Sequence, residues 1–177
     1  MNTAPYRLLG PTERVRYWRG HAERAVPAVV TLVLVAAMTA PLFASAPVVP
    51  HLGLLGVFVW ATFQPRLMPP WLAFVIGGVS DILFGLPLGV NATLLPAVAV
   101  FVRIVAARFG AHSHSFDWLL AAGVVIAFEL LQWQLLAIAG IRGPLAPLLV
   151  QAATTILAYP AVVLLFAQIQ RRLAAKR

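Results

Sequence analysis

Residues 64–89 read QPRLMPPWLAFVIGGVSDILFGLPLG. An apolar run of membrane length fills most of this stretch and ends on the carboxylate of Asp81, and a Gly-x-Pro-x-Gly turn follows at residues 85–89. An Asp at the bilayer centre costs about 2.5–3.5 kcal/mol on insertion scales, so such residues usually face other helices and find partners there. We therefore expect Asp81 to have a structural or functional task at the end of a membrane span.

The whole chain is apolar. Of its 177 residues, 62% are hydrophobic and 10% are charged, whereas a soluble domain carries about 25% charged residues. This composition predicts an all-α, polytopic membrane protein. The absence of cysteine excludes disulfides and thiolate metal sites. The net charge of +8 does not indicate nucleic-acid binding, because the basic residues lie between apolar segments, where they set membrane topology.

Six apolar segments are expected to be transmembrane helices. A helix needs about 20 apolar residues to cross the hydrocarbon core. The second segment has only 16, which indicates a small tilt or a locally thinner bilayer. The expected spans are Ala25–Ala46, Val48–Phe63, Leu67–Phe84, Leu88–Ala107, Phe116–Gly140 and Leu145–Ile169.

The basic residues predict the orientation of these spans. Twelve of the 13 Lys and Arg residues fall on one side, including Arg66 after Pro65, and Arg142 alone falls on the other. The positive-inside rule then places both termini in the cytoplasm, which requires an even number of spans. The predicted organisation is a basic cytoplasmic tail at residues 1–24, a six-helix transmembrane domain at 25–169, and a basic cytoplasmic tail at 170–177.

Two alternatives concern the N-terminal part of the chain. Ala44-Ser45-Ala46 resembles a signal-peptide cleavage site, but the preceding basic region and apolar run are longer than a signal peptide has. Cleavage would also leave five spans, so we expect the first helix to remain. The tail itself is either a disordered basic segment or an interfacial amphipathic helix capped by Thr12.

Polar residues near the outer ends of the spans form the first candidate site. Asp81 and Asn91 each lie three residues from the outer end of adjacent, oppositely directed spans, so they should share one depth. Arg142 lies in the next outer connection. We hypothesise a cluster of these three residues with the turn residues Gly85, Pro87 and Gly89. The alternative is that Asp81 satisfies backbone groups at a helix end.

A second group of polar residues lies deeper. Glu129 is near the middle of the fifth span, with Gln132 on the same helical face at i+3. In the sixth span Gln151 and Thr155 share a face, and Thr155 matches Glu129 in depth. These four residues are interpreted as a hydrogen-bonded seam between the fifth and sixth spans. A role in transport or proton relay is the sharper alternative.

The segment from Gln64 to Phe101 resembles the MreD family of bacterial rod shape-determining membrane proteins. The residues that carry the resemblance follow the family's pattern of a glycine-rich helix ending in Asp-Leu-Leu-x-Gly-x-Pro-Leu-Gly, with Ile82 in place of one Leu. They are Pro65, Arg66, Gly78, Asp81, Leu83, Gly85, Pro87, Leu88 and Gly89.

The resemblance implies a function and a fold. MreD-like proteins are non-enzymatic members of the elongation machinery that builds the lateral cell wall, in the bacterial inner membrane. Expected partners are MreC, the RodA glycosyltransferase, a class B penicillin-binding transpeptidase and, indirectly, MreB filaments, besides membrane lipids. The fold implied is similar to the substrate-binding subunits of energy-coupling-factor transporters.

The residues themselves are compatible with three classes of function. A scaffold fits the few polar groups and the one charged turn, and it requires no cofactor or metal. A transporter subunit would need a pocket where polar groups converge, for which Asp81, Asn91, Glu129, Gln132 and Gln151 are candidates. An intramembrane enzyme would need a nucleophile–base pair, which the sequence does not present.

Overall fold

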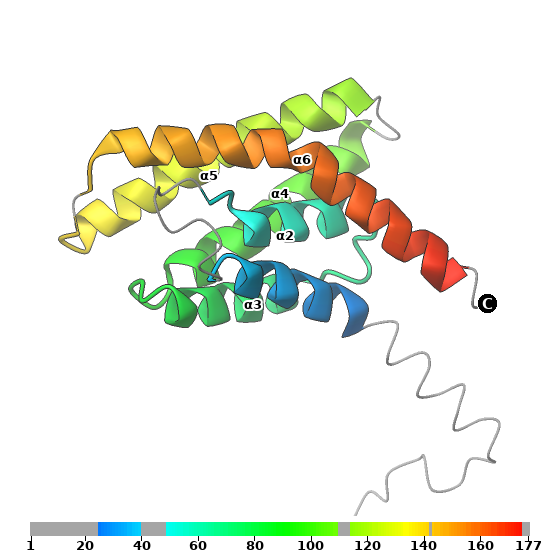
Figure 1. The fold of residues 1–177 in the computed structure, drawn as a ribbon, viewed down its shortest axis with the longest axis horizontal. Helices are drawn as coiled ribbons and strands as arrows, with labels where there is room; N and C mark the ends of the chain where they lie inside the picture. Colours follow the sequence, from blue (N-terminus) through cyan, green and yellow to red (C-terminus); the bar gives the residue numbers. More distant parts are fainter. Residues whose placement is uncertain (1–24, 40–48, 110–113, 142, 175–177) are drawn as a thin grey trace, which may run out of the picture.

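The computed structural model describes residues 25–39, 49–109, 114–141 and 143–174. Over these ranges the chain forms six α-helices and no strand, as the composition predicts for an all-α protein. In the resulting bundle α5 lies beside α6 (Figure 1). The helices are an N-terminal helix Ala25–Ala37, α2 Leu52–Phe63, α3 Pro70–Leu83, α4 Val90–Phe109, α5 His114–Ile138 and α6 Leu145–Ala174.

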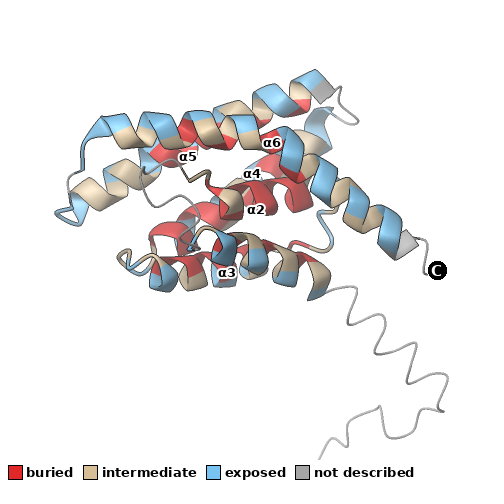
Figure 2. Ribbon diagram, viewed as in Figure 1, coloured by how far each residue is buried: buried red, intermediate tan, exposed pale blue. Residues whose placement is uncertain are grey.

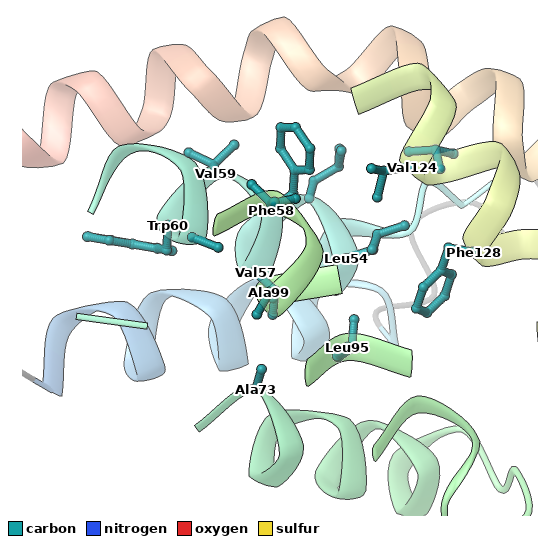
Figure 3. Packing of buried hydrophobic residues seen from close by; sticks show 14 of the residues in the cluster. Leu54, Val57, Phe58, Val59, Trp60, Ala73, Leu95, Ala99, Val124 and Phe128 are labelled. Carbon is teal, nitrogen blue, oxygen red and sulfur yellow. The ribbon is translucent and has the colours of Figure 1, made fainter. Parts of the chain in front are cut away.

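α2 is the centre of the bundle. It is apolar on nearly all sides, and a helix of that kind belongs in a protein interior. Accordingly, every residue from 53 to 61 is buried, as the continuous red of α2 in Figure 2 shows. Figure 3 shows that side chains from three other helices gather around it; those labelled are Ala73, Leu95, Ala99, Val124 and Phe128.

The N-terminal helix approaches α2 closely at two glycines. A Cβ atom at Gly53 would lie 2.8 Å from Val35 Cγ2, and one at Gly56 would lie 2.9 Å from Thr31 Cγ2. Both distances are too short for a real side chain. Because glycine has no side chain, these two positions let the N-terminal helix and α2 approach closely, as small residues do in membrane bundles.

α3 and α4 pack still more closely. A Cβ atom at Gly77 of α3 would lie 2.3 Å from the backbone oxygen of Asn91 and 2.6 Å from the Cα of Ala92, at the start of α4. The neighbouring Gly78 has open space beside it. Gly77 thus allows close packing between α3 and α4 within the bundle.

The lengths of the helices divide them into two groups. Three are long and apolar enough to cross a membrane by themselves: α4, Ser115–Ile138 of α5 and Leu145–Arg172 of α6. The N-terminal helix, α2 and α3 are shorter. At 1.5 Å per residue, the 12-residue α2 rises about 18 Å, against a hydrocarbon core about 30 Å thick.

Prolines account for two features of the helices. The third expected span begins at Leu67, but α3 begins at Pro70, because proline fits the first position of a helix and forces the preceding residue to be extended. Pro160 lies inside α6, where it removes a backbone hydrogen bond. Figure 1 shows that α6 bends along its length, as expected for a proline-containing span.

The contrast between Gly77 and Gly78 can be tested. We expect Gly77→Ala to lower the free energy of unfolding by about 1–3 kcal/mol, because the added methyl group meets backbone atoms that cannot move aside cheaply. Gly78→Ala should be neutral or stabilising by about 1 kcal/mol, since alanine is the better helix former. Thermal unfolding in detergent would measure both. Equal melting temperatures for the two variants would contradict the close α3–α4 packing.

Candidate functional site

The turn between α3 and α4 begins with a hydrogen-bonded helix end. The backbone N–H of Leu86 donates to the carbonyl of Asp81 at 2.9 Å, and that of Gly85 donates to the carbonyl of Ile82 at 3.4 Å. This pair of bonds is a Schellman motif, which requires a left-handed residue. Gly85 supplies it with a φ of 62°, so the glycine is needed for its backbone conformation.

The carboxylate of Asp81 caps the next helix. Its Oδ1 accepts the backbone N–H of Asn91 at 2.9 Å, and its Oδ2 accepts those of Gly89 at 2.9 Å and Ala92 at 3.3 Å. The remaining N–H of this turn, on Val90, donates to the carbonyl of Pro87 at 3.3 Å. All four N–H groups that a helix start leaves without partners are therefore satisfied.

This arrangement explains how a buried charge is tolerated. The Asp81 side chain is completely buried, and it lies at the positive end of the α4 dipole, where a negative charge is stabilised. Gly89, with a φ of 111°, lets the chain turn tightly into α4. The contacts of Asp81 are thus those of the alternative interpretation, in which its carboxylate satisfies backbone groups at a helix end.

Only part of the predicted cluster of Asp81, Asn91 and Arg142 lies within the described residues. Asp81 and Asn91 are in contact, but through the backbone N–H of Asn91 and not through its side chain. Arg142 lies outside the described residues, so its pairing with Asp81 stays a prediction. Both carboxylate oxygens of Asp81 already accept hydrogen bonds.

The deeper polar residues are arranged differently from the predicted seam. Thr155 of α6 donates to the carbonyl of Gln151 at 2.6 Å and accepts the backbone N–H of His51 at 2.8 Å. It therefore joins α6 to the start of α2. Among the described residues no hydrogen bond joins it to Glu129, whose buried Oε1 has no partner. Thr155 therefore connects α6 to α2, and not α6 to α5 as predicted.

His51 is a structural residue that the sequence reasoning passed over. Its Nδ1 accepts the backbone N–H of Leu54 at 3.3 Å, so it caps the start of α2. Its ring meets that of Phe128 in α5 edge-on, with the centroids 5.0 Å apart. A polar residue directly before an apolar helix was the available signal.

Arg103 is a second residue whose role was missed. The sequence places it near the cytoplasmic end of α4, as a topology signal. Its guanidinium donates to the carbonyls of Pro65 and, at 3.1 Å, Met68. The α2–α3 connection is thereby held against α4. Arg66, beside Pro65, is exposed.

Three of the five predicted pocket residues converge on one cavity. It has a volume of about 340 Å³. Asn91, Gln132 and Gln151 line it, whereas Asp81 and Glu129 do not. Asn91 is fully buried, and neither its Oδ1 nor its Nδ2 has a hydrogen-bond partner among the residues that the structure describes. The other lining residues are Met38, Val49, His51, Phe84 and Leu86.

The capping role of Asp81 leads to a stability prediction. Asp81→Ala leaves three N–H groups at the start of α4 without this acceptor, two of them in buried bonds, so we expect a loss of at least about 2 kcal/mol. Asp81→Asn should lose less, because it keeps one acceptor oxygen. Thr93→Val is the control, since the Thr93 hydroxyl bonds only carbonyls of its own helix start. A melting temperature of Asp81→Ala equal to that of Thr93→Val would rule out this cap.

The comparisons with known proteins extend the resemblance beyond the turn. The family model described as rod shape-determining protein MreD matches residues 24–171. That range contains all six described helices except the last residues of α6. No curated protein and no solved structure matches the chain. The family match assigns a membrane protein with a part in determining rod shape, and we conclude that this chain belongs to the MreD family.

Proposed function

We propose that the protein is a non-enzymatic scaffold in the bacterial inner membrane, within the machinery that builds the lateral cell wall. In this proposal it binds MreC, and through MreC it is linked to RodA, a class B penicillin-binding transpeptidase and MreB filaments. The family match supports this direction, since the family determines rod shape.

The observation that carries the proposal is the surface of the α3–α4 turn. The polar groups of this turn are satisfied internally by Asp81 and Pro87, so its backbone is rigid. Two large apolar side chains beside it point outward, Ile82 at 70% and Leu88 at 76% exposure. A rigid support with exposed apolar groups is suited to protein contact.

The proposed topology has six spans with both termini in the cytoplasm. The contact of Arg103 with the α2–α3 connection supports this topology. The positive-inside rule assigns both Arg103 and that connection to the cytoplasmic side. The cavity lined by Asn91, Gln132 and Gln151 supports the topology too. Its residues come from the helix ends far from Arg103, and these ends are assigned to the periplasmic side.

The second candidate is a small-molecule-binding subunit of a transporter. The cavity lined by Asn91, Gln132 and Gln151 is the observation that favours it. A scaffold and a transporter subunit differ in their partners, so isolation of the complex distinguishes them.

The experiment is a pull-down of the tagged protein from its own cells in mild detergent, with mass spectrometry of the bound proteins. We expect recovery of MreC and the wall synthases, and weaker recovery with the double variant Ile82→Ser, Leu88→Ser, because both exposed apolar groups are lost. The control is Leu157→Ser, which changes a similarly exposed leucine on α6. Recovery of a transporter's ATPase subunits would support the second candidate and contradict the first. Equal recovery by the two serine variants would exclude the turn as the contact surface.

A further inference from the structure

The polar cavity differs from the other hollows of the bundle. The described residues that line a groove of about 500 Å³ between α4 and α5 are all apolar, among them Phe101, Leu119 and Gly123. Another of about 580 Å³ lies beside Pro160 and is mostly apolar. Such surfaces suit lipid chains. The cavity of about 340 Å³ is lined in part by three residues with side-chain amides, Asn91, Gln132 and Gln151.

Asn91 is the residue that points to a ligand. It is completely buried, with 0% of its surface accessible, and its amide donor and acceptor have no partner in the described part of the chain. The buried Oε1 of Gln132 also has no partner among these described residues. Leaving a buried polar group unpaired costs about 1–3 kcal/mol. Buried polar groups that a protein keeps at such a cost are typical of functional sites.

The rest of the structure holds Asn91 in place. Its backbone N–H is bound by the Asp81 carboxylate, and its own carbonyl lies against Gly77 of α3. The side chain is thus presented from a helix start whose position is determined from two sides. Precise support of this kind is what a binding group requires.

We infer that this cavity binds an uncharged small molecule carrying a hydrogen-bond donor and acceptor side by side, as a carboxamide or a vicinal diol does. The amide of Asn91 offers an acceptor beside a donor. Because 0% of Asn91 is accessible, the side chains around it shift when the ligand pairs with it in two bonds. No Asp, Glu, Lys or Arg is among the described residues that line the cavity, so a charged ligand would be left without a counter-ion. Phe84 and Leu86 offer apolar contact to the rest of the molecule.

The size and position of the cavity fit this class. Pockets for small molecules have volumes of about 300–1,000 Å³ and combine apolar walls with a few placed polar groups. The lining comes from the end of the N-terminal helix, the connection before α2, the α3–α4 turn, α5 and the starts of α4 and α6. In the proposed topology this end of the bundle faces the periplasm, so the ligand enters from the periplasmic side. The inference itself does not depend on the scaffold role.

The test uses the full-length protein in lipid nanodiscs and follows its melting temperature. The probes are nicotinamide and glucose, each compared with its carboxylate analogue, nicotinate and glucuronate. We expect at least one uncharged probe to raise the melting temperature by about 3–6 °C at ten times its Kd, with no rise for its analogue. No rise with either uncharged probe, or equal rises with the charged analogues, would overturn the inference and leave a cavity that holds only water.

Variants make the test specific to the cavity. Asn91→Leu should fold with an unchanged or higher melting temperature, because it removes unpaired buried polar atoms, and it should lose the response to the probe. Gln132→Met should weaken the response. Gln134→Met is the control, because Gln134 is exposed on the same helix and does not line the cavity. An undiminished response of Asn91→Leu would place the probe elsewhere and contradict the inference. The purified protein contains no partner, so failure here leaves the scaffold proposal intact.

Discussion

The hydrogen bonding of the Asp81 carboxylate to the start of α4 is the interaction on which this end of the bundle depends. One side chain from the end of α3 accepts three backbone N–H groups of the next helix. It thereby fixes the direction in which α4 leaves the turn, and it does so inside an apolar bundle, where unsatisfied backbone groups are costly. The glycines at 85 and 89 supply the positive φ angles that the turn needs. The motif that resembles the MreD family is therefore a structural unit, a helix end and a helix start joined by one carboxylate.

The core depends on close approach between helices. α2 has only 12 residues, and those from 53 to 61 are all buried inside the bundle. Glycines at 53, 56 and 77 let neighbouring helices come nearer than any side chain would allow. The long helices α4, α5 and α6 carry many exposed apolar side chains, as expected for surfaces in contact with lipid. The short α2 thus forms the centre of the core, whereas the long helices carry exposed apolar side chains suited to contact with lipid.

These features connect the two proposed roles. The same turn that exposes Ile82 and Leu88 on its outside holds Asn91 on its inside. A ligand in the cavity and a protein on the turn would therefore contact opposite sides of one rigid element. Any difference in ligand affinity between the free and the partner-bound protein would require, by thermodynamic linkage, an equal effect of the ligand on partner binding. The geometry gives a scaffold of this kind a direct route for such coupling.

The sequence by itself determined the class of this protein, because hydropathy and helix length are properties of a local segment. It predicted the six helical segments, the tight hairpin that brings Asp81 level with Asn91, and the family resemblance. It did not determine the partners of the polar groups. The acceptor role of Asp81 toward the α4 backbone, the bond between Thr155 and His51, the contact of Arg103 with Pro65 and the convergence of Asn91, Gln132 and Gln151 were decided only by the tertiary structure. The physical reason is that a polar side chain bonds whatever the rotation and packing of its helix bring within about 3 Å, and neither rotation nor packing is encoded in any single segment.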